Sequence, residues 1–148
     1  MHTLWHDTDR QHLLDRLARL TPDHRARWGR MNAPQMVTHL AEAMRMALGD
    51  LPCEPKYVPW RYAPIKQLVV YWLPWPQGAP TAKELLARQP DGDWDAGVAE
   101  LRALVERLAR RDPRAPWPEH PAFGTLSTRG WGVLGYRHMD HHLRQFGV

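Results

Sequence analysis

Apolar residues recur every three or four positions along four long stretches of the chain, the spacing that places side chains on one face of an α-helix. The first stretch begins near Asp7 or Thr8, residue types that favour a helix N-cap, and ends at Thr21 and Pro22. Its apolar face consists of Leu13, Leu14, Leu17 and Leu20. We therefore predict an amphipathic helix over these residues.

The second stretch has the clearest start and end signals and is predicted to form a helix over residues 33–48. Asn32 can cap its N-terminus, Pro34 lies in the first turn, where its missing N–H does no harm, and Gly49 follows the last periodic residue. His39 lies beside the inward face of this helix. The inward face consists of Met36, Leu40, Ala43, Met44 and Ala47.

Residues 50–90 break the helical pattern, because they are rich in proline and in aromatic side chains. The apolar run 65–73 is predicted to form a helix of two to three turns that starts near Pro64, although periodicity alone does not distinguish a helix from a strand here. A crossover of this length lets the two helices that flank it run parallel. We expect its aromatic residues to border the mouth of a site at one end of the bundle; a plain packing layer is the alternative. These residues are Tyr57, Trp60, Tyr62, Tyr71, Trp72 and Trp75.

Two more helices are predicted in the second half of the chain. The third runs from about Asp91 or Asp93 to Arg111, and its inward residues are Trp94, Val98, Leu101, Val105 and Leu108. The fourth begins after the N-cap residue Ser127. Its predicted inward face is Trp131, Leu134, His138, His142 and Gln145, and its predicted solvated face is Val133, Arg137, Asp140 and Arg144. The whole pattern predicts an all-α fold, a four-helix bundle with a long crossover between the second and third bundle helices.

His138 and His142 lie one turn apart on the inward face of the last helix. At this spacing their Cβ atoms are about 5–6 Å apart, so that both imidazoles can bind one divalent ion. His39 is the candidate for a third ligand. The alternatives are a solvated histidine-rich helix end for the pair and, for His39, a core histidine hydrogen-bonded to a carbonyl group. Buried polar groups without partners cost about 1–3 kcal/mol each, and this cost favours the metal site.

Two neighbouring side chains are candidate catalytic residues. Glu42, three residues after His39, could hold a ligand nitrogen or act on a bound water, although the pattern slightly favours an ordinary exposed helix carboxylate. His141 lies about 100° around the helix from His142. It is assigned to substrate contact or to support of a ligand, and it is also the main rival for the place of His142. His120, in the loop before the last helix, is expected to make a structural hydrogen bond.

Composition narrows the classes of protein to which the chain can belong. Its 148 residues, 43% of them hydrophobic, suit one globular domain over residues 1–148. The single cysteine, Cys53, excludes an internal disulfide and suits a reducing cytoplasm, and no apolar run approaches the roughly 20 residues that span a bilayer. The net charge is +4, but the arginines are spread along the chain without a long basic block, which disfavours nucleic-acid binding.

Two segments carry a resemblance to a known family. They are LARLTPDHRARWGRMNAPQMVTHLAEAMRMALG, which contains His39, and HPAFGTLSTRGWGVLGYRHMDHHLRQFGV at the C-terminal end. Together they resemble a bacterial subgroup, a domain of unknown function, of the DinB/YfiT-like superfamily, over nearly the whole chain. The resemblance implies an up-down-down-up bundle whose metal is held by one histidine of the second helix and an H-x-x-x-H pair of the last. These positions match His39, His138 and His142.

One departure from the family pattern is visible at the start of the last helix. Relatives often carry two acidic residues after the capping serine, whereas this chain has Thr128, Arg129 and Gly130 after Ser127. The change removes half of a capping box and places a glycine in the first turn, which costs about 1 kcal/mol of helix propensity. It leaves the candidate ligands intact.

The resemblance also implies a function. Superfamily members of known activity are metal-dependent transferases or isomerases that use a low-molecular-weight thiol such as mycothiol, bacillithiol or glutathione. We therefore expect an enzyme, a thiol transferase or isomerase or else a hydrolase, in which His39, His138 and His142 hold a Zn, Ni or Fe ion. One position on the ion stays open for water or a thiolate. The alternative is a non-catalytic metal-binding or metal-stabilised bundle. We also expect a homodimer formed through exposed aromatic side chains.

Overall fold

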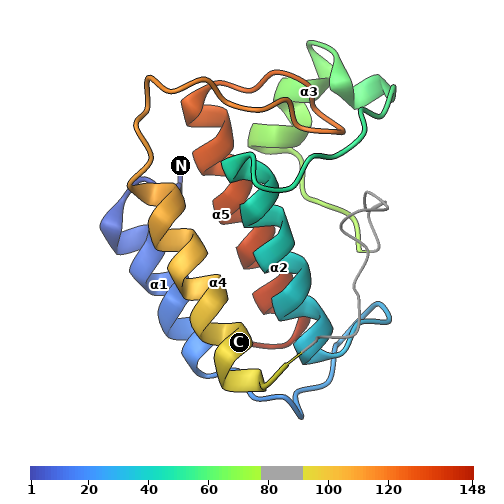
Figure 1. The fold of residues 1–148 in the computed structure, drawn as a ribbon. Coiled ribbons are helices and arrows are strands. Elements are labelled where there is room, and N and C mark those ends of the chain that lie inside the picture. The colour runs from blue at the N-terminus through green and yellow to red at the C-terminus, as the bar shows by residue number, and fades with distance from the viewer. Residues whose placement is uncertain (78–91) are drawn as a thin grey trace.

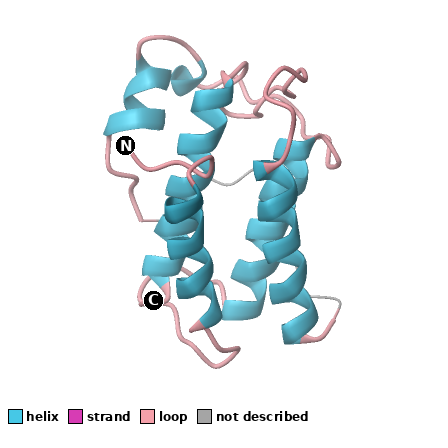
Figure 2. Ribbon diagram, turned by 90° about the vertical axis from the view of Figure 1, so that its left-hand side faces the viewer, coloured by secondary structure: helices cyan, strands magenta, loops and turns pink. Residues whose placement is uncertain are grey.

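The computed structural model describes residues 1–77 and 92–148, and these residues form helices joined by loops, with no strand among them (Figures 1 and 2). Four helices are long: α1 (Asp7–Ala18), α2 (Ala33–Leu48), α4 (Trp94–Ala109) and α5 (Thr128–Gln145). The shorter elements are η1 (Pro59–Arg61), α3 (Ile65–Gln67) and η2 (Leu68–Trp72). The prediction of an all-α fold is confirmed.

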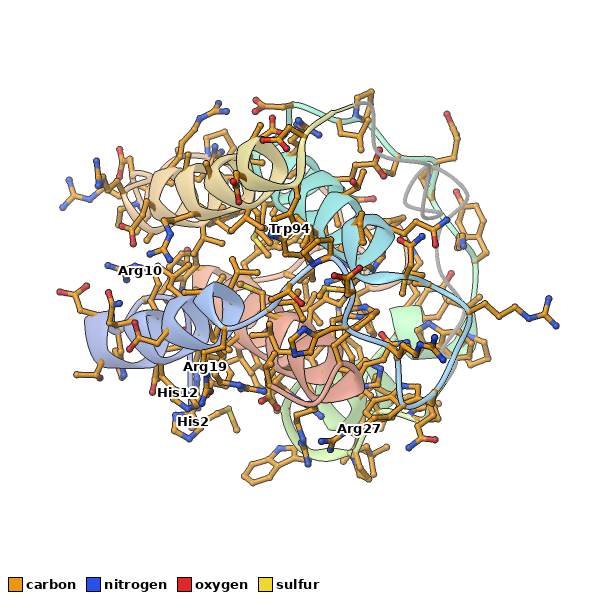
Figure 3. All side chains as sticks on the ribbon, turned by 90° about the horizontal axis from the view of Figure 1, so that it is seen from below. His2, Arg10, His12, Arg19, Arg27 and Trp94 are labelled. Atoms are coloured by element: carbon orange, nitrogen blue, oxygen red, sulfur yellow. The ribbon has the colours of Figure 1, made fainter. Side chains whose placement is uncertain are left out.

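The four long helices pack side by side as a bundle (Figure 1). α2 packs against α4 and α5, and α1 packs against α5. Arg10 of α1 donates to Glu106 of α4 at 3.2 Å, and seen from below the bundle it lies between these two helices (Figure 3). α2 and α4 run in one direction and α1 and α5 in the other, which is the up-down-down-up order (Figure 1).

α2 begins and ends where its sequence signals predict. The side chain of Asn32 accepts a hydrogen bond from the backbone N–H of Gln35, and the Gln35 side chain accepts one from the backbone N–H of Asn32. This capping box satisfies two N–H groups that a helix start leaves without intrahelical partners. Gly49 ends the helix with φ 86°, a left-handed conformation that glycine adopts without steric cost.

The start of α5 is also as predicted, since the side chain of Ser127 accepts from the backbone N–H of Gly130 at 3.1 Å. The starts of α1 and α4 lack the expected side-chain cap. α1 begins at Asp7 after His6, and α4 begins at Trp94 after Asp93; neither preceding residue makes a side-chain capping bond. On α4, Trp94 and Val98 are only partly buried, because the helix packs mainly through its C-terminal half. The fully packed residues there are Leu101, Leu104, Val105 and Leu108. The other predicted start of this helix, Asp91, lies outside the described residues, as does the rest of 78–91.

The crossover after α2 contains the predicted short helix, since α3 and η2 are consecutive and cover residues 65–72. η2 packs against α5. Arg137 of α5 donates to the carbonyl oxygens of Val69 at 2.9 Å, of Val70 at 2.7 Å and of Leu73. The crossover is therefore attached to the helix that carries two of the candidate ligands.

The predicted solvated face of α5 is mostly covered, which corrects the sequence prediction. Val133 is 2% exposed, Arg137 is bound to the crossover, and Asp140 accepts from Arg16 of α1 at 2.6 Å. Only Arg144 of that face is exposed. The amphipathic pattern fails here because α5 has neighbours on three sides, namely α1, α2 and η2.

Two glycines of α5 let residues 3–5, the N-terminal arm, cross this helix closely. A Cβ on Gly132 would lie 2.2 Å from Nε1 of Trp5, and one on Gly135 would lie 2.5 Å from Cδ1 of Leu4. The N–H of Leu4 donates to the carbonyl of Gly132 at 3.1 Å. These glycines are therefore explained by close packing of residues 3–5 on the helix.

A bilayer crossing is not found in the described part of the chain, where no helix combines the length and the hydropathy that one requires.

Candidate metal centre

Three histidines from two helices meet inside the bundle. His39 comes from α2, and His138 and His142 come from consecutive turns of α5. One potential ligand atom from each lies within 4.8 Å of the others. Nε2 of His39 and Nε2 of His138 are 3.0 Å apart, and the ring centroids are 4.8–4.9 Å from one another. The structure thus brings together the three side chains that the sequence singled out.

Burial keeps two of these imidazoles uncharged. His142 is 8% exposed, and burial is the main reason that its pKa falls to about 3, with the nearby His39 as a further cause. The pKa of His138 is also lowered, first by burial and then by His142 and His39. A metal ion binds the neutral imidazole, whose lone pair a proton would otherwise occupy. The neutral forms of His138 and His142 therefore suit a cation.

The dimensions and chemistry of the cluster fit one metal ion. Four-coordinate nitrogen ligands at about 2.0–2.1 Å from an ion are about 3.3 Å apart, so a spread between 3.0 and 4.8 Å needs only small ring movements. Imidazole nitrogens bind zinc, nickel, iron and copper. Three protein ligands with a fourth position left for water or substrate are typical of catalytic sites, whereas structural zinc sites have four protein ligands.

The side chain of Gln145 is hydrogen-bonded to Nδ1 of the His142 ring. Gln145, which is 3% exposed, places Oε1 2.8 Å from Nδ1 of His142. Its Nε2 donates to the carbonyl oxygen of Trp28 at 2.7 Å. Arg27, the neighbour of Trp28, lies beside the end of α5 when the bundle is viewed from below, and its N–H donates to the Gln145 carbonyl at 2.8 Å (Figure 3).

His141 lies outside the three-histidine cluster, among aromatic rings. Its ring centroid is 5.8 Å from that of Trp28, 6.0 Å from that of Trp75 and 5.3 Å from that of His142. Burial, and then the charge of Arg144, lowers the pKa of His141. His141 is therefore not among the side chains that could share one ion with His39.

Glu42 is 7% exposed, so it is not the exposed helix carboxylate that the pattern of α2 slightly favoured. The helix is more deeply enclosed than an amphipathic pattern suggests, because it packs against both α4 and α5. The buried position keeps Glu42 a candidate for a role near His39.

The crossover reaches the centre through Trp75, whose ring centroid lies 6.0 Å from that of His138. Trp75 donates from Nε1 to the carbonyl oxygen of Val69 at 3.1 Å, and the guanidinium of Arg137 lies 5.3 Å from its ring centroid. In contrast, Tyr57, Tyr62 and Trp72 of the crossover are exposed. Of the aromatic residues that the sequence assigned to a border, Trp75 therefore lies next to the cluster.

The remaining candidates have local roles. Nδ1 of His120 accepts from the backbone N–H groups of Ala122 and Phe123, which confirms the predicted structural hydrogen bond. Burial, and then Arg61, lowers the pKa of His120 to about 3. Cys53 is half-buried, with Sγ 3.8 Å from the carbonyl oxygen of Leu51.

Two surface hollows lie elsewhere. One of about 410 Å³ is lined by α1 and Glu106, and one of about 750 Å³ lies along α4, where its lining includes Arg102, Arg107 and Arg110. Neither contains a histidine. Both are open and lined by charged side chains, so the converging imidazole nitrogens are the stronger indication of a site.

Sequence reasoning missed Trp28, Gln145 and Arg137 as parts of the site's surroundings. Gln145 was placed on the inward face without a role, and Trp28 was part of a polar connection. The one signal in the sequence was the glycine after Trp28, because glycine favours the left-handed backbone conformation that Gly29 adopts, with φ 81°.

Comparison with known proteins gives a family without an assigned activity. No curated protein and no solved structure matches the chain significantly. A family model does match, over residues 4–147, and its description is a protein of unknown function. The chain, with its buried cluster of three histidines, belongs to the DUF1569 family.

Proposed function

We propose that this protein is a divalent-metal-dependent enzyme in which His39, His138 and His142 hold the ion. The observation that carries the proposal is the meeting of three imidazoles from α2 and α5, with ligand atoms within 4.8 Å of one another. Imidazole nitrogens inside a protein are costly unless a cation or hydrogen-bond partners satisfy them. One or more positions on the ion stay open to water or substrate.

The bound ion would lower the pKa of a water or thiol that it holds and so supply a nucleophile near neutral pH. The chain's own residues would handle the rest. Glu42, buried three residues after His39, is proposed to take or hold a proton beside the ion. His141 is proposed to contact the substrate, since its ring lies beside those of Trp28 and Trp75, which would supply apolar walls.

The proposed co-substrate is a low-molecular-weight thiol, and the reaction is a thiol transfer or an isomerisation. Support for this choice is the resemblance of the His39 segment and of the C-terminal H-x-x-x-H segment to the DinB/YfiT-like superfamily. A thiolate is a good ligand for the metals that imidazole binds, which makes the two parts of the proposal compatible.

The second candidate is a metal-stabilised bundle without turnover. The depth of His39 and His142, which are 3% and 8% exposed and come from two helices, favours it, because an ion there would cross-link α2 to α5. Access to the ion separates the two candidates. An enzyme needs an open position, and a structural site is closed.

Cobalt substitution tests this difference. The Co²⁺-loaded protein is titrated with a small thiol while its visible and near-ultraviolet absorption is recorded. The proposed enzyme should show a thiolate-to-cobalt band and altered visible absorption. Unchanged spectra at saturating thiol would contradict the thiol proposal, and unchanged spectra with azide as well would favour the closed, structural site.

A further inference from the structure

Gln145, near the C-terminal end of α5, joins the ligand helix to the segment that precedes α2. Three of its atoms are engaged. Nε2 donates to the carbonyl oxygen of Trp28 at 2.7 Å, Oε1 lies 2.8 Å from Nδ1 of His142, and the backbone carbonyl accepts from the N–H of Arg27 at 2.8 Å. The side chain is 3% exposed, so water does not compete strongly for these bonds.

The partners of the amide fix its direction. The carbonyl oxygen of Trp28 can only accept, so the amide atom that faces it must be the NH₂ group. The amide oxygen therefore faces His142, and because it can only accept, Nδ1 of His142 must carry the hydrogen. A neutral imidazole carries one N–H, so Nε2 of His142 keeps its lone pair.

We propose that Gln145 is a positioning residue that holds His142 in the Nδ1–H tautomer and so directs its Nε2 lone pair to the metal centre. The inference rests on the proposed three-histidine site. The His142 ring lies 4.8 Å from that of His39 and 4.9 Å from that of His138. A hydrogen bond to the second nitrogen of a ligand histidine typically contributes about 10- to 100-fold to metal affinity.

Gly29 makes the contact between Gln145 and Trp28 possible. It has φ 81°, and a Cβ at this position would lie 2.7 Å from Nε2 of Gln145. Gly49 has nearly the same backbone conformation, φ 86°, but nothing lies within 4 Å of a Cβ built there. An alanine costs backbone strain at both positions, whereas only the one at residue 29 would displace the Gln145 amide. The two glycines are therefore a matched pair.

Nitrogen NMR of the imidazole groups in the metal-free wild-type protein tests the tautomer directly. We expect His142 to show a protonated Nδ1 and an unprotonated Nε2 at neutral pH. In Gln145→Met this preference should be lost, because the methionine side chain offers Nδ1–H no strong acceptor. The opposite tautomer in the wild-type protein would overturn the proposal, even if no variant folds.

Metal affinity supplies the second test, with Zn²⁺ competed against a chromophoric chelator. Gln145→Met and Gly29→Ala should bind Zn²⁺ about 10- to 100-fold more weakly. Gly49→Ala and the exposed control Gln11→Met should bind it as the wild type does. Wild-type affinity in folded Gln145→Met would overturn the proposal. If the wild-type protein binds no metal, the three-histidine centre fails, and the tautomer measurement still decides whether Gln145 controls His142.

Discussion

His39 and His138 bring their Nε2 atoms within 3.0 Å of each other, although 99 positions separate them in the chain. Two imidazole lone pairs at this distance repel each other unless a proton or a cation lies between them. A shared proton joins only two rings, whereas His142 also approaches both, with centroid distances of 4.8 and 4.9 Å. A metal ion accounts for all three rings at once.

Removing the ring of Trp75 should expose the ion. Trp75 is the aromatic residue of the crossover whose ring lies 6.0 Å from that of His138. In Trp75→Ala we expect a chelator to remove Zn²⁺ several-fold faster than from the wild type, because less apolar surface shields the open position. The control is Trp72→Ala, since Trp72 is 72% exposed. Equal chelation rates for Trp75→Ala and Trp72→Ala would show that the crossover does not shield the centre.

Adding a methyl group where the N-terminal arm, residues 3–5, crosses α5 should destabilise the bundle. A Cβ on Gly132 would lie 2.2 Å from Nε1 of Trp5, so Gly132→Ala should displace the N-terminal arm and cost about 1–3 kcal/mol in urea unfolding. Gly97 of α4 is the matched control, because a Cβ there would make an ordinary 3.8 Å contact with Val37. Gly97→Ala should gain up to about 1 kcal/mol from helix propensity. A stabilised Gly132→Ala protein would mean that the arm does not pack on α5 in solution.

The stability of the metal-free protein should fall as the pH falls below about 6.5. His120 has a folded-state pKa of about 3 against an ordinary value of 6.5, because burial disfavours its charged form. Between these values the unfolded chain binds a proton that the folded chain does not, so stability rises with pH, by at most about 1.4 kcal/mol per pH unit for one group. His142, also at about 3, acts in the same direction.

The variant His120→Asn separates the contribution of His120 to this pH dependence from that of His142. The asparagine oxygen can accept from the N–H groups of Ala122 and Phe123 as Nδ1 does, but it does not titrate. Urea unfolding between pH 4.5 and 7 with chelator present should therefore show a shallower loss of stability on acidification in this variant. Parallel curves for the two proteins would exclude His120 as a source of the pH dependence.

Self-association should depend on the outer face of the crossover helix. Ile65 of α3 and Leu68 and Trp72 of η2 are 43%, 45% and 72% exposed, so this part of the crossover presents large apolar side chains to solvent. We expect a second copy of the chain to cover it, and Trp72→Glu to weaken the dimer measured by sedimentation equilibrium. Arg110→Glu, at the exposed C-cap residue of α4, is the control. A wild-type protein that stays monomeric at high concentration would refute the expected homodimer.

The sequence predicts those parts of the fold that local signals determine. α2 has the bounds expected from Asn32, Pro34 and Gly49, because its caps are made by residues within a few positions of the helix ends. His138 and His142 could be paired from spacing alone, since one helical turn places both on the same face.

Other features depend on contacts between distant residues. Val133 was assigned to the solvated face of α5, and only the packing of three neighbouring elements around that helix explains its burial. Gln145 and Trp28 are 117 positions apart, and no local pattern indicates that they meet. The burial of Glu42 likewise follows from the packing of α2 between α4 and α5.

Metal analysis of protein purified without an affinity tag tests the central claim most directly. The wild-type protein should contain about one divalent ion per chain. Alanine in place of His39, His138 or His142 should abolish stoichiometric metal, whereas His120→Ala and His24→Ala should retain it, because both side chains bond to their own loops. Retention in His142→Ala with loss in His141→Ala would move the ligand by one residue. Full metal retention in His138→Ala would contradict the three-histidine centre itself.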